Sequence, residues 1–371
     1  MVDLKGQYVK IGSEIDNAIK QVIEQTSFIN GPAVKQFSDA LATYLNVKYV
    51  ISCANGTDAL QIALMALSLK PGDEVIVPCF TYVATAEVIA LLRLKPVMVD
   101  VDPITFDITA EIIEKAITPK TKAIVPVHLF GQCVDMEPIL EIAKKYNIYI
   151  IEDTAQAIGA EYIFKDGQVK KAGTIGHIGS TSFFPSKNLG CYGDGGALYT
   201  NDADLAAKMQ MIANHGQEKK YHHKVVGVNS RLDSIQAAIL NVKLTHLNSY
   251  AAARNKAAAY YDRHLSNISW LEVPVKKANS THVYHQYTIK LKDTSDRDKL
   301  KRHLMDQNIP SMIYYPIALH LQDAFKTPEY NLGDFRVSED LCTRVLSLPM
   351  HTEMDEQQLN YIIEAIRSFK Q

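Results

Sequence analysis

Short apolar runs alternate with helical patterns from about residue 48 to residue 245, and this alternation limits the folds that the chain can adopt. The runs that predict strands are residues 74–78, 96–100, 122–127 and 149–151. Helical patterns, such as the one from Met136 to Tyr146, separate them. Strands that alternate with helices are typical of a parallel or mostly parallel sheet with helices on both faces. We therefore expect an α/β architecture.

The pattern changes in the last third of the chain. Residues 231 to about 265 have helical periodicity and are long enough to link two domains. After Trp270 the sequence predicts a strand at 285–291, a helix at 297–307, a strand at 311–315 and a terminal amphipathic helix at 355–369. We expect a large domain over residues 1–245 and a smaller α+β domain over residues 246–371 that includes the linking helix.

Composition agrees with a globular protein and excludes several partners. The chain has 371 residues, enough for a sizeable core, with 47% hydrophobic and 22% charged residues. A formal charge of −2 provides no basic stripe, so we expect no nucleic-acid partner. No apolar run approaches the ~20 residues that span a bilayer, and the first residues lack a signal-peptide core. We expect a cytoplasmic protein that does not enter a membrane.

The sequence predicts no metal site. Five cysteines, at 53, 79, 133, 191 and 342, are scattered and lack metal-ligand spacing, so they are interpreted as reduced thiols. His222 and His223 are adjacent, and adjacent residues do not face one point. We interpret them as surface or pocket-rim residues.

An acid and a lysine in glycine-rich surroundings indicate chemistry. Asp153 follows the apolar run from Ile148 to Ile151, and ligands of open α/β sheets collect beyond the carboxyl ends of such strands. Lys187 lies further on, in the glycine-rich segment 181–196. Alone, Asp153 could cap a helix and Lys187 could be a solvated surface residue. Together they suit pyridoxal phosphate (PLP), whose aldehyde needs an amine and whose ring nitrogen needs a fixed carboxylate.

A third segment is predicted to bind the phosphate group of PLP. Residues 49–64 predict a strand, a glycine turn and an amphipathic helix, and the free N–H groups at a helix start favour a phosphate. Gly56 and Thr57 would donate to it. The alternative is that Asn55, Thr57 or Asp58 only caps the helix, and both interpretations can hold at once.

Six segments carry a family resemblance. They are CANGTDAL (53–60), PCFTYVATAE (78–87), IIEDTAQAIGA (150–160), SFFPSKNLGCYGDGGALYTND (182–202), NHGQEKKYHH (214–223) and GVNSRLDSIQAAIL (227–240). In this order they resemble the sugar-nucleotide aminotransferases of the DegT/DnrJ/EryC1/StrS family, and the resemblance runs essentially from end to end. It implies the fold-type I aspartate aminotransferase architecture. It is strongest with the branch that aminates C3 of UDP-3-keto-hexuronic acid sugars (UDP-2-acetamido-2-deoxy-3-keto-glucuronate) in bacterial O-antigen assembly.

The resemblance implies a role for each cofactor residue. It assigns Lys187 to the covalent bond with the aldehyde and Asp153 to the ring nitrogen. Gln156 would bond to the phenolic oxygen, and Ser182 to the phosphate. Tyr82 would stack on the pyridine face, an interaction worth roughly 1 kcal/mol, although alone it is better interpreted as a core aromatic residue.

The resemblance also implies a shared site and a substrate pocket. Asn229 matches an amide that reaches the phosphate from the neighbouring subunit, which implies an obligate homodimer. Arg231 matches a position that faces the substrate pocket in the family, where its planar fork would suit a carboxylate. Tyr314 and Tyr315 match the substrate-binding loop, but relatives carry His-Tyr-Pro where this chain has Tyr-Tyr-Pro. This departure leaves the exact sugar open.

The predicted function is transfer of the amino group of L-glutamate to a keto carbon, expected to be C3, of a nucleotide-linked sugar. The alternatives are a dTDP-3- or 4-keto-6-deoxyhexose aminotransferase, a dehydratase and a regulatory member of the family. Dehydratases replace the lysine with histidine, so Lys187 argues against that activity. A regulatory protein would not need Lys187, Asp153 and Ser182 together. A nucleotide-binding oxidoreductase is disfavoured because no G-x-G-x-x-G follows the first strand.

Overall fold

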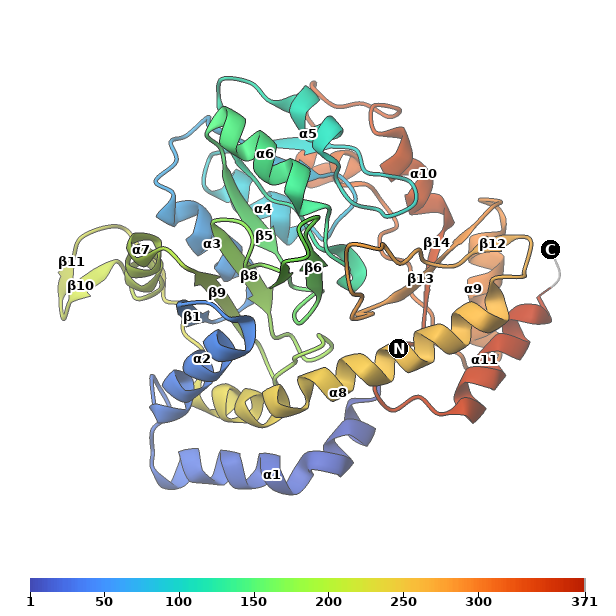
Figure 1. The fold of residues 1–371 in the computed structure, drawn as a ribbon, viewed down its shortest axis with the longest axis horizontal. Coiled ribbons are helices and arrows are strands. Elements are labelled where there is room, and N and C mark those ends of the chain that lie inside the picture. Colours follow the sequence, from blue (N-terminus) through green and yellow to red (C-terminus); the bar gives the residue numbers. More distant parts are fainter. Residues whose placement is uncertain (370–371) are drawn as a thin grey trace.

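A seven-stranded sheet forms the centre of the large domain in the computed structural model, which describes residues 1–369 (Figure 1). Only β9 runs against its neighbours, so the expected mostly parallel sheet is confirmed. Across the sheet the strands are β1 (Tyr49–Cys53), β9 (Gly196–Thr200), β8 (Ile178–Ser182), β5 (Tyr149–Asp153), β4 (Thr121–Ile124), β2 (Glu74–Pro78) and β3 (Lys95–Val99).

Helices cover both faces of this sheet, which is why its central strands are apolar on both sides (Figure 1). All five residues of β2 are buried. The helices of one face are α3 (Gly56–Ala66), α4 (Ala84–Leu91) and α7 (Ala203–Ala213). Those of the other face include α5 (Ala110–Ala116) and α6 (Met136–Tyr146), while α2 (Pro32–Leu45) packs on β1 and on the linking helix. A short 3-10 turn, η1 (Leu129–Gly131), follows β4.

The linking helix α8 (Ser234–Leu265) runs from the large sheet to the small domain, as Figure 1 shows. Its first half packs with Phe37 and Phe183 in the core under α2, and its second half joins the core of the small domain. The boundary predicted after residue 245 falls inside this helix and stays a prediction. Helix α1 (Leu4–Glu24), which was not predicted, lies along α8 through Ile11 and Ile15.

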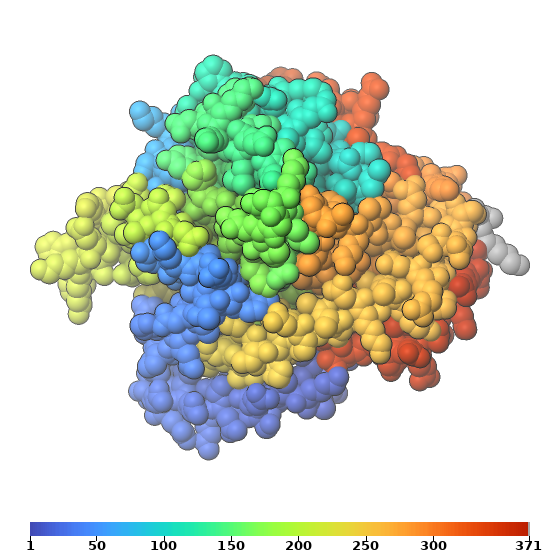
Figure 2. All heavy atoms as spheres, viewed as in Figure 1, coloured from blue at the N-terminus to red at the C-terminus, as the bar shows by residue number. Residues whose placement is uncertain are grey.

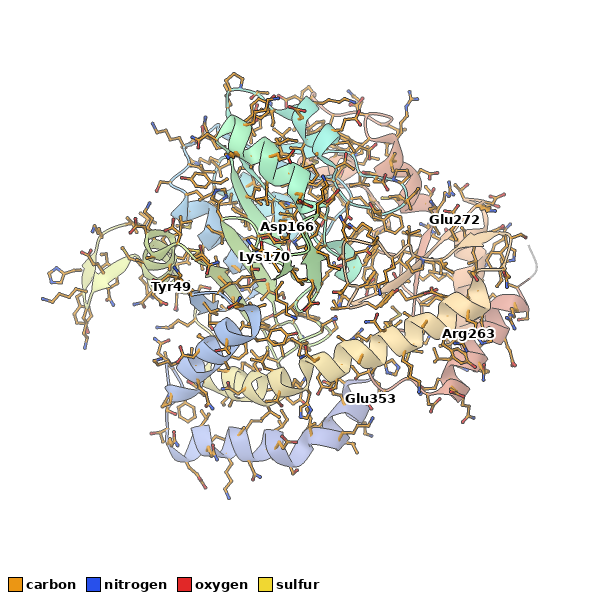
Figure 3. All side chains as sticks on the ribbon, viewed as in Figure 1. Tyr49, Asp166, Lys170, Arg263, Glu272 and Glu353 are labelled. Carbon is orange, nitrogen blue, oxygen red and sulfur yellow. The ribbon has the colours of Figure 1, made fainter. Side chains whose placement is uncertain are left out.

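The small domain contains a three-stranded antiparallel sheet with strands β12 (Leu271–Glu272), β13 (Tyr287–Leu291) and β14 (Val345–Leu348). Its helices α9 (Asp296–Asp306) and α11 (Glu356–Arg367) pack in the core of the small domain. Leu319 of the 3-10 turn η2 (Leu319–Leu321), Phe325 of the 3-10 turn η3 (Asp323–Phe325) and Leu341 of α10 (Arg336–Arg344) instead pack in the core around the large sheet. Tyr49 on β1 and Glu272 on β12 lie on opposite sides of the molecule in Figure 3.

The strand predicted at 311–315 was wrong. Only Met312 pairs, as an isolated bridge to Ser347, and the sheet instead takes β14, all four residues of which are buried. The aromatic and β-branched residues of the segment favoured a strand, but Pro310 and Pro316 bracket it and limit its backbone pairing. The segment is therefore a loop that crosses toward the large sheet.

Two hairpins lie outside these sheets. One pairs β6 (Glu161–Ile163) with β7 (Val169–Lys171), and the other pairs β10 (Gln217–Lys219) with β11 (His222–His223). Figure 2 shows the second hairpin projecting as an arm from the body of the molecule, with His222 and His223 exposed as expected. Within residues 1–369, no helix combines the length and the apolar character that a membrane crossing requires.

Candidate active site

The predicted acid and the predicted phosphate-binding serine end neighbouring parallel strands. Asp153 is the last residue of β5 and Ser182 is the last residue of β8, and the two strands pair in parallel. Their carboxyl ends therefore meet at one edge of the sheet, where ligands of such sheets bind. Asp153 is 7% exposed, and its side chain is not solvated as a surface residue would be.

Two donors hold the Asp153 carboxylate. Its Oδ1 accepts the backbone N–H of Ala155 at 3.0 Å, and its Oδ2 accepts the hydroxyl of Thr85 at 3.2 Å. Burial raises the pKa of Asp153, while these donors and the charge of Lys187 oppose that change. A cationic partner at this carboxylate would favour its charged form.

Glu152 fixes the end of β5 from the opposite side of the strand. Its fully buried carboxylate accepts His128 Nε2 at 2.9 Å and the backbone N–H groups of Gly173, Ile175 and Gly176 at 2.8, 2.7 and 2.6 Å. A carboxylate with four donors resists displacement. Glu152 therefore holds the strand that carries Asp153.

Lys187 lies on the loop between β8 and β9. It is half-buried, and burial lowers its pKa to about 8, while the charge of Asp153 acts in the opposite direction. At pH 7 about a tenth of such an amine is unprotonated, against well under a thousandth for an ordinary lysine. The site thus holds an amine of lowered pKa whose charge interacts with that of a buried carboxylate.

A second lysine has a similarly low pKa but lacks the surroundings of a site. Burial lowers the pKa of Lys243 to about 8, and its Nζ donates to the backbone oxygen of Gly190 at 2.8 Å and lies 4.4 Å from the ring centre of Tyr192. Among the residues that the structure describes, no carboxylate pairs with it. Through its bond to Gly190, Lys243 stabilises the loop that carries Lys187.

Glycines on this loop allow close backbone contacts. A Cβ on Gly190 would lie 2.4 Å from the oxygen of Pro185, and one on Gly196 would lie 2.4 Å from the carbonyl carbon of Asn55. Both distances are too short for any side chain. The contact at Gly196 brings β9 against the start of α3.

The start of α3 has the features of a phosphate site. Asn55 caps the helix by accepting the N–H of Asp58 at 2.8 Å, so the capping interpretation is confirmed for Asn55. The N–H groups of Gly56 and Thr57 have no acceptor within residues 1–369. A Cβ on Gly56 would lie 2.6 Å from Cβ of Ser182, so the structure brings Gly56, Thr57 and Ser182 together as predicted.

Tyr82 and Tyr315 form an aromatic wall. Tyr82 is 57% exposed, so it is not a core aromatic residue, and its ring centre lies 6.4 Å from that of Tyr315. The ring of Tyr315 contacts Phe80 with ring centres 5.9 Å apart. Its hydroxyl accepts Gln156 Nε2 at 3.1 Å, and Gln156 Oε1 accepts the N–H of Phe130 at 2.7 Å. The link between Gln156 and Tyr315 was not predicted from the sequence.

The remaining predicted residues, Tyr314, Asn229 and Arg231, are less enclosed than Asp153. Tyr314 is half-buried, with its ring centre 5.9 Å from that of Tyr315. Asn229 is exposed, and Arg231 is half-buried without an ion pair or side-chain hydrogen bond among residues 1–369. Between them, Ser230 is fully buried and its Oγ accepts the N–H of Ala54 at 3.0 Å. This bond connects the loop that contains residues 229–231 to the segment between β1 and α3.

Sequence reasoning missed three residues of this region. Thr85 supports Asp153 from the start of α4, while Asn188 and His285 meet behind Lys187 at 3.2 Å. Thr85 belongs to the same motif as Tyr82, but a threonine on an apolar helix gives no signal of its own. Asn188 and His285 lie 97 positions apart in the sequence, and only the fold brings them together. Residues 1–369 contain no group of three or more His, Cys, Asp or Glu side chains that could hold a metal ion.

Comparisons with known proteins agree with this geometry. A model of the DegT/DnrJ/EryC1/StrS aminotransferase family matches residues 9–367. The chain is 47% identical over 365 residues, 98% of each chain, to a UDP-2-acetamido-2-deoxy-3-oxo-D-glucuronate aminotransferase of Pseudomonas aeruginosa. It is 45% identical over 367 residues, 99% of this chain and 96% of the relative, to a UDP-N-acetyl-3-dehydro-α-D-glucosamine 3-aminotransferase of Acidithiobacillus ferrooxidans. A pleiotropic regulatory protein of Geobacillus stearothermophilus is 46% identical over 371 residues, 100% of this chain and 98% of its own.

Solved structures of related proteins have the same fold as this chain. The crystal structure of an aminotransferase of this family from Brucella abortus matches with a TM-score of 0.93 and 42% identity, over 99% of this chain and 98% of its own. A Bacillus subtilis protein solved with bound pyridoxamine phosphate (PMP) matches with a TM-score of 0.88 and 34% identity, over 96% of this chain and 81% of its own.

Proposed function

The chain belongs to the DegT/DnrJ/EryC1/StrS aminotransferase family, and we propose that it transfers the amino group of L-glutamate to C3 of a UDP-linked 3-keto-hexuronic acid. The observation that carries the proposal is the Lys187 amine, with its pKa lowered to about 8, beside Asp153 at the carboxyl edge of the sheet. The two relatives at 47% and 45% identity are both named for UDP-linked sugars with a 3-keto group. These names support UDP and C3.

The residues of the site fit PLP. The buried Asp153 carboxylate suits the ring nitrogen, the free N–H groups of Gly56 and Thr57 beside Ser182 suit the phosphate, and Tyr82 provides an exposed aromatic face. When bound, PLP supplies an electron sink that lets a proton leave Cα of the amino donor. Asp153 would keep the ring nitrogen protonated, and the Lys187 amine would carry the proton from Cα of the donor to the cofactor carbon that bears the amino group. In the second half of the reaction Lys187 returns a proton to the sugar carbon.

The low pKa of Lys187 predicts how the protein captures its cofactor. An amine attacks an aldehyde only when it is unprotonated. The rate at which cofactor-free protein binds PLP should therefore rise about tenfold per pH unit up to about pH 8 and then level off. Stopped-flow absorbance measures this rate, with N-acetyl-lysine amide as the reference. A rate that rises alongside the reference beyond pH 9 would show that Lys187 has an ordinary pKa.

Arg231 is the proposed partner of the sugar's C6 carboxylate. It is half-buried with no ion pair among residues 1–369, so its fork is free to bind a ligand. The relatives differ at C6, because one is named for a glucuronate and the other for a glucosamine. The carboxylate is therefore the feature of the substrate that most needs a test.

Replacing Arg231 with alanine should lower kcat/KM for the 3-keto-glucuronate by about 10- to 100-fold, because a charge-assisted hydrogen bond worth roughly 1.5–3 kcal/mol is lost. The 3-keto-glucosamine substrate, which has a hydroxyl at C6, should change less than about threefold. Measuring each half-reaction separately keeps the glutamate carboxylate out of the comparison. Equal losses for both sugars, with a slowed glutamate half-reaction, would assign Arg231 to the donor instead.

Asn229 is proposed to reach the phosphate site of a second copy of the chain. Its side chain is exposed, while neighbouring Ser230 anchors the loop next to α3. In a symmetric dimer, a residue beside one site can complete the site of the other copy. This arrangement would make the homodimer necessary for activity.

Mixing an inactive variant with a strongly impaired one tests the shared site. A Lys187→Ala chain paired with an Asn229→Ala chain should form heterodimers with about half of the wild-type activity, because one of the two sites is then intact. Separately tagged chains allow purification of verified heterodimers, and each homodimer is assayed alone as a control. Heterodimers no more active than the mean of the two homodimers would show that Asn229 serves its own chain.

A regulatory role is the second candidate, because a relative of nearly equal identity is named a pleiotropic regulatory protein. Lys187, Asp153 and the free N–H groups at α3 favour catalysis over that role, since regulation alone does not require a reactive amine beside a buried acid. Turnover of a keto-sugar nucleotide at a rate typical of enzymes, about 1 per second or more, would support the enzymatic function.

A further inference from the structure

The loop that contains the two predicted substrate-binding tyrosines is attached at both ends. We call residues 312–320 the crossing segment. At its start, Met312 pairs with Ser347 of β14 in the small sheet. At its end, the N–H of Leu319 donates to the oxygen of Cys79 at 3.1 Å, directly beyond β2 of the large sheet. The two tyrosines therefore lie between one attachment to each sheet.

Cys79 is a fixed point of the large sheet. It is fully buried, and its N–H donates to the oxygen of Val99 at 2.8 Å. It also precedes the segment that carries Phe80 and Tyr82, whose ring centres lie 5.9 and 6.4 Å from that of Tyr315. The attachment at Cys79 therefore holds the crossing segment close to the aromatic wall.

His320 strengthens this attachment with both nitrogens of its ring. The residue is 1% exposed, its Nδ1 lies 3.0 Å from Sγ of Cys79, and its Nε2 lies 2.9 Å from Oε1 of Glu339 on α10. The two oxygens of Glu339 also accept the N–H of Gly333 at 2.8 and 2.9 Å. Because these oxygens accept, Nε2 of His320 carries a hydrogen and donates it.

The thiol of Cys79 donates to the other nitrogen of the ring. Burial raises the pKa of Cys79 to about 12, so the sulfur keeps its hydrogen at neutral pH. With a hydrogen on Nε2, Nδ1 of a neutral imidazole is an acceptor. A thiol, an imidazole and a carboxylate in this order also occur in nucleophilic catalysis, but a fully buried thiol with a raised pKa is inert. The arrangement is therefore suited to holding a segment in place.

The carboxylate at the far end of this series is held by the large sheet as well. Asp100, which follows β3, accepts the N–H groups of Val337 and Ser338 at 2.9 and 2.8 Å. These groups belong to the first turn of α10, where a carboxylate is favourable. Glu339 is the next residue of the helix. His320 therefore lies between two partners that are both fixed at the carboxyl edge of the large sheet.

We propose that His320 is a positioning residue that holds Tyr314 and Tyr315 in the substrate pocket by fixing the end of the crossing segment to Cys79 and Glu339. This inference rests on the proposed function, because a substrate role for the two tyrosines is part of it. A loop that is already ordered binds its ligand more tightly than one that binding must order. Glutamate is much smaller than a nucleotide-linked sugar, so its half-reaction should depend less on this loop.

Three substitutions separate this role from ordinary packing. Cys79→Ala removes the thiol donor and leaves the bond between His320 and Glu339. His320→Gln can still donate to Glu339 with its amide nitrogen but no longer accepts from Cys79, so the two variants remove the same bond from its two ends. Cys342→Ala is the matched control, because Cys342 is buried in the same core and its sulfur makes no hydrogen bond within residues 1–369.

Hydrogen exchange of the full chain, read by mass spectrometry of the peptide that contains Leu319, measures the attachment without any sugar. The Leu319 amide should exchange about fivefold faster in Cys79→Ala and in His320→Gln. The double variant should be no faster, because the same bond is already lost. Cys342→Ala should change the rate less than about twofold.

Three exchange results would overturn the proposal. They are an unchanged rate in Cys79→Ala, an equal acceleration in Cys342→Ala, and additive effects of Cys79→Ala and His320→Gln in the double variant. If His320→Gln does not fold, the comparison of the two cysteine variants still decides, because Cys79 and Cys342 lie in the same core and only Cys79 contacts His320.

Kinetics test whether the attachment serves the substrate. In Cys79→Ala and His320→Gln, KM for the UDP-linked keto sugar should rise about fivefold, while the single-turnover rate with glutamate should change less than about twofold. Equal losses in both half-reactions, or faster exchange with an unchanged KM, would show that His320 only stabilises the fold. If the wild type aminates no keto sugar but exchange behaves as expected, the proposed function is contradicted and the attachment through His320 remains.

Discussion

Replacing Lys187 with alanine is expected to lower the rate of amino transfer by at least about 10⁴-fold and to leave the fold intact. The amine is needed both to hold the cofactor aldehyde and to move the proton, so no other group of the site replaces it. Stability should change little, because Lys187 is half-buried and burial already disfavours its charge. The measurements are single-turnover rates with glutamate and thermal unfolding of both proteins.

Lys243→Met is the matched control for this prediction. Lys243 has the same low pKa of about 8, but its Nζ donates to the oxygen of Gly190 and lies over the ring of Tyr192. Borohydride reduction of the PLP-loaded protein, followed by peptide mass spectrometry, should place the cofactor on Lys187 in the wild type and in Lys243→Met. A reduced cofactor on Lys243, or near wild-type transfer by Lys187→Ala, would show that the lysine was wrongly assigned.

The second large effect is expected from Asp153→Asn. An amide has the size of the carboxylate but does not keep a ring nitrogen protonated, so kcat should fall by about 10²- to 10³-fold or more. Stability should not fall, because burial raises the pKa of Asp153, which means that the fold disfavours its charged form. Stopped-flow rates of both half-reactions and denaturant unfolding measure the two quantities.

Asp107→Asn is the control for Asp153→Asn, because the two substitutions should have opposite effects on stability and on kcat. Asp107 is also buried, but its carboxylate forms an ion pair with Lys277. Its substitution should destabilise the protein by leaving that lysine without its partner, with kcat of the folded protein retained. If Asp153→Asn, like Asp107→Asn, lost stability and kept its kcat, Asp153 would have a structural role and no part in the reaction.

The parts of the site that the sequence predicted are those built from contiguous motifs. Asp153 was found because a continuous apolar run marks β5, and Gly56 and Thr57 because a strand, a glycine and an amphipathic helix follow each other. The capping by Asn55 was among the alternatives and is confirmed. Such signals are local, so they survive without knowledge of the tertiary fold.

The parts that were missed depend on contacts between distant segments. The hydrogen bond between Gln156 and Tyr315 joins residues that are 159 positions apart in the sequence, and the one between His285 and Asn188 joins residues that are 97 positions apart. The predicted strand at 311–315 failed for the same reason, because the small sheet pairs β13 with β14, which follows α10 much later in the chain. Local propensity is weaker than burial in deciding which segment joins a sheet.

The proposed function is tested most directly by following the nitrogen atom itself. The PLP-loaded protein is incubated with ¹⁵N-labelled L-glutamate and UDP-2-acetamido-2-deoxy-3-keto-glucuronate, and NMR locates the label in the sugar product. We expect ¹⁵N bonded to C3 of the UDP-sugar, in an amount equal to the 2-oxoglutarate formed. A UDP-sugar recovered without label, while a 4-keto or dTDP-linked sugar accepts the ¹⁵N under the same conditions, would contradict the proposed substrate.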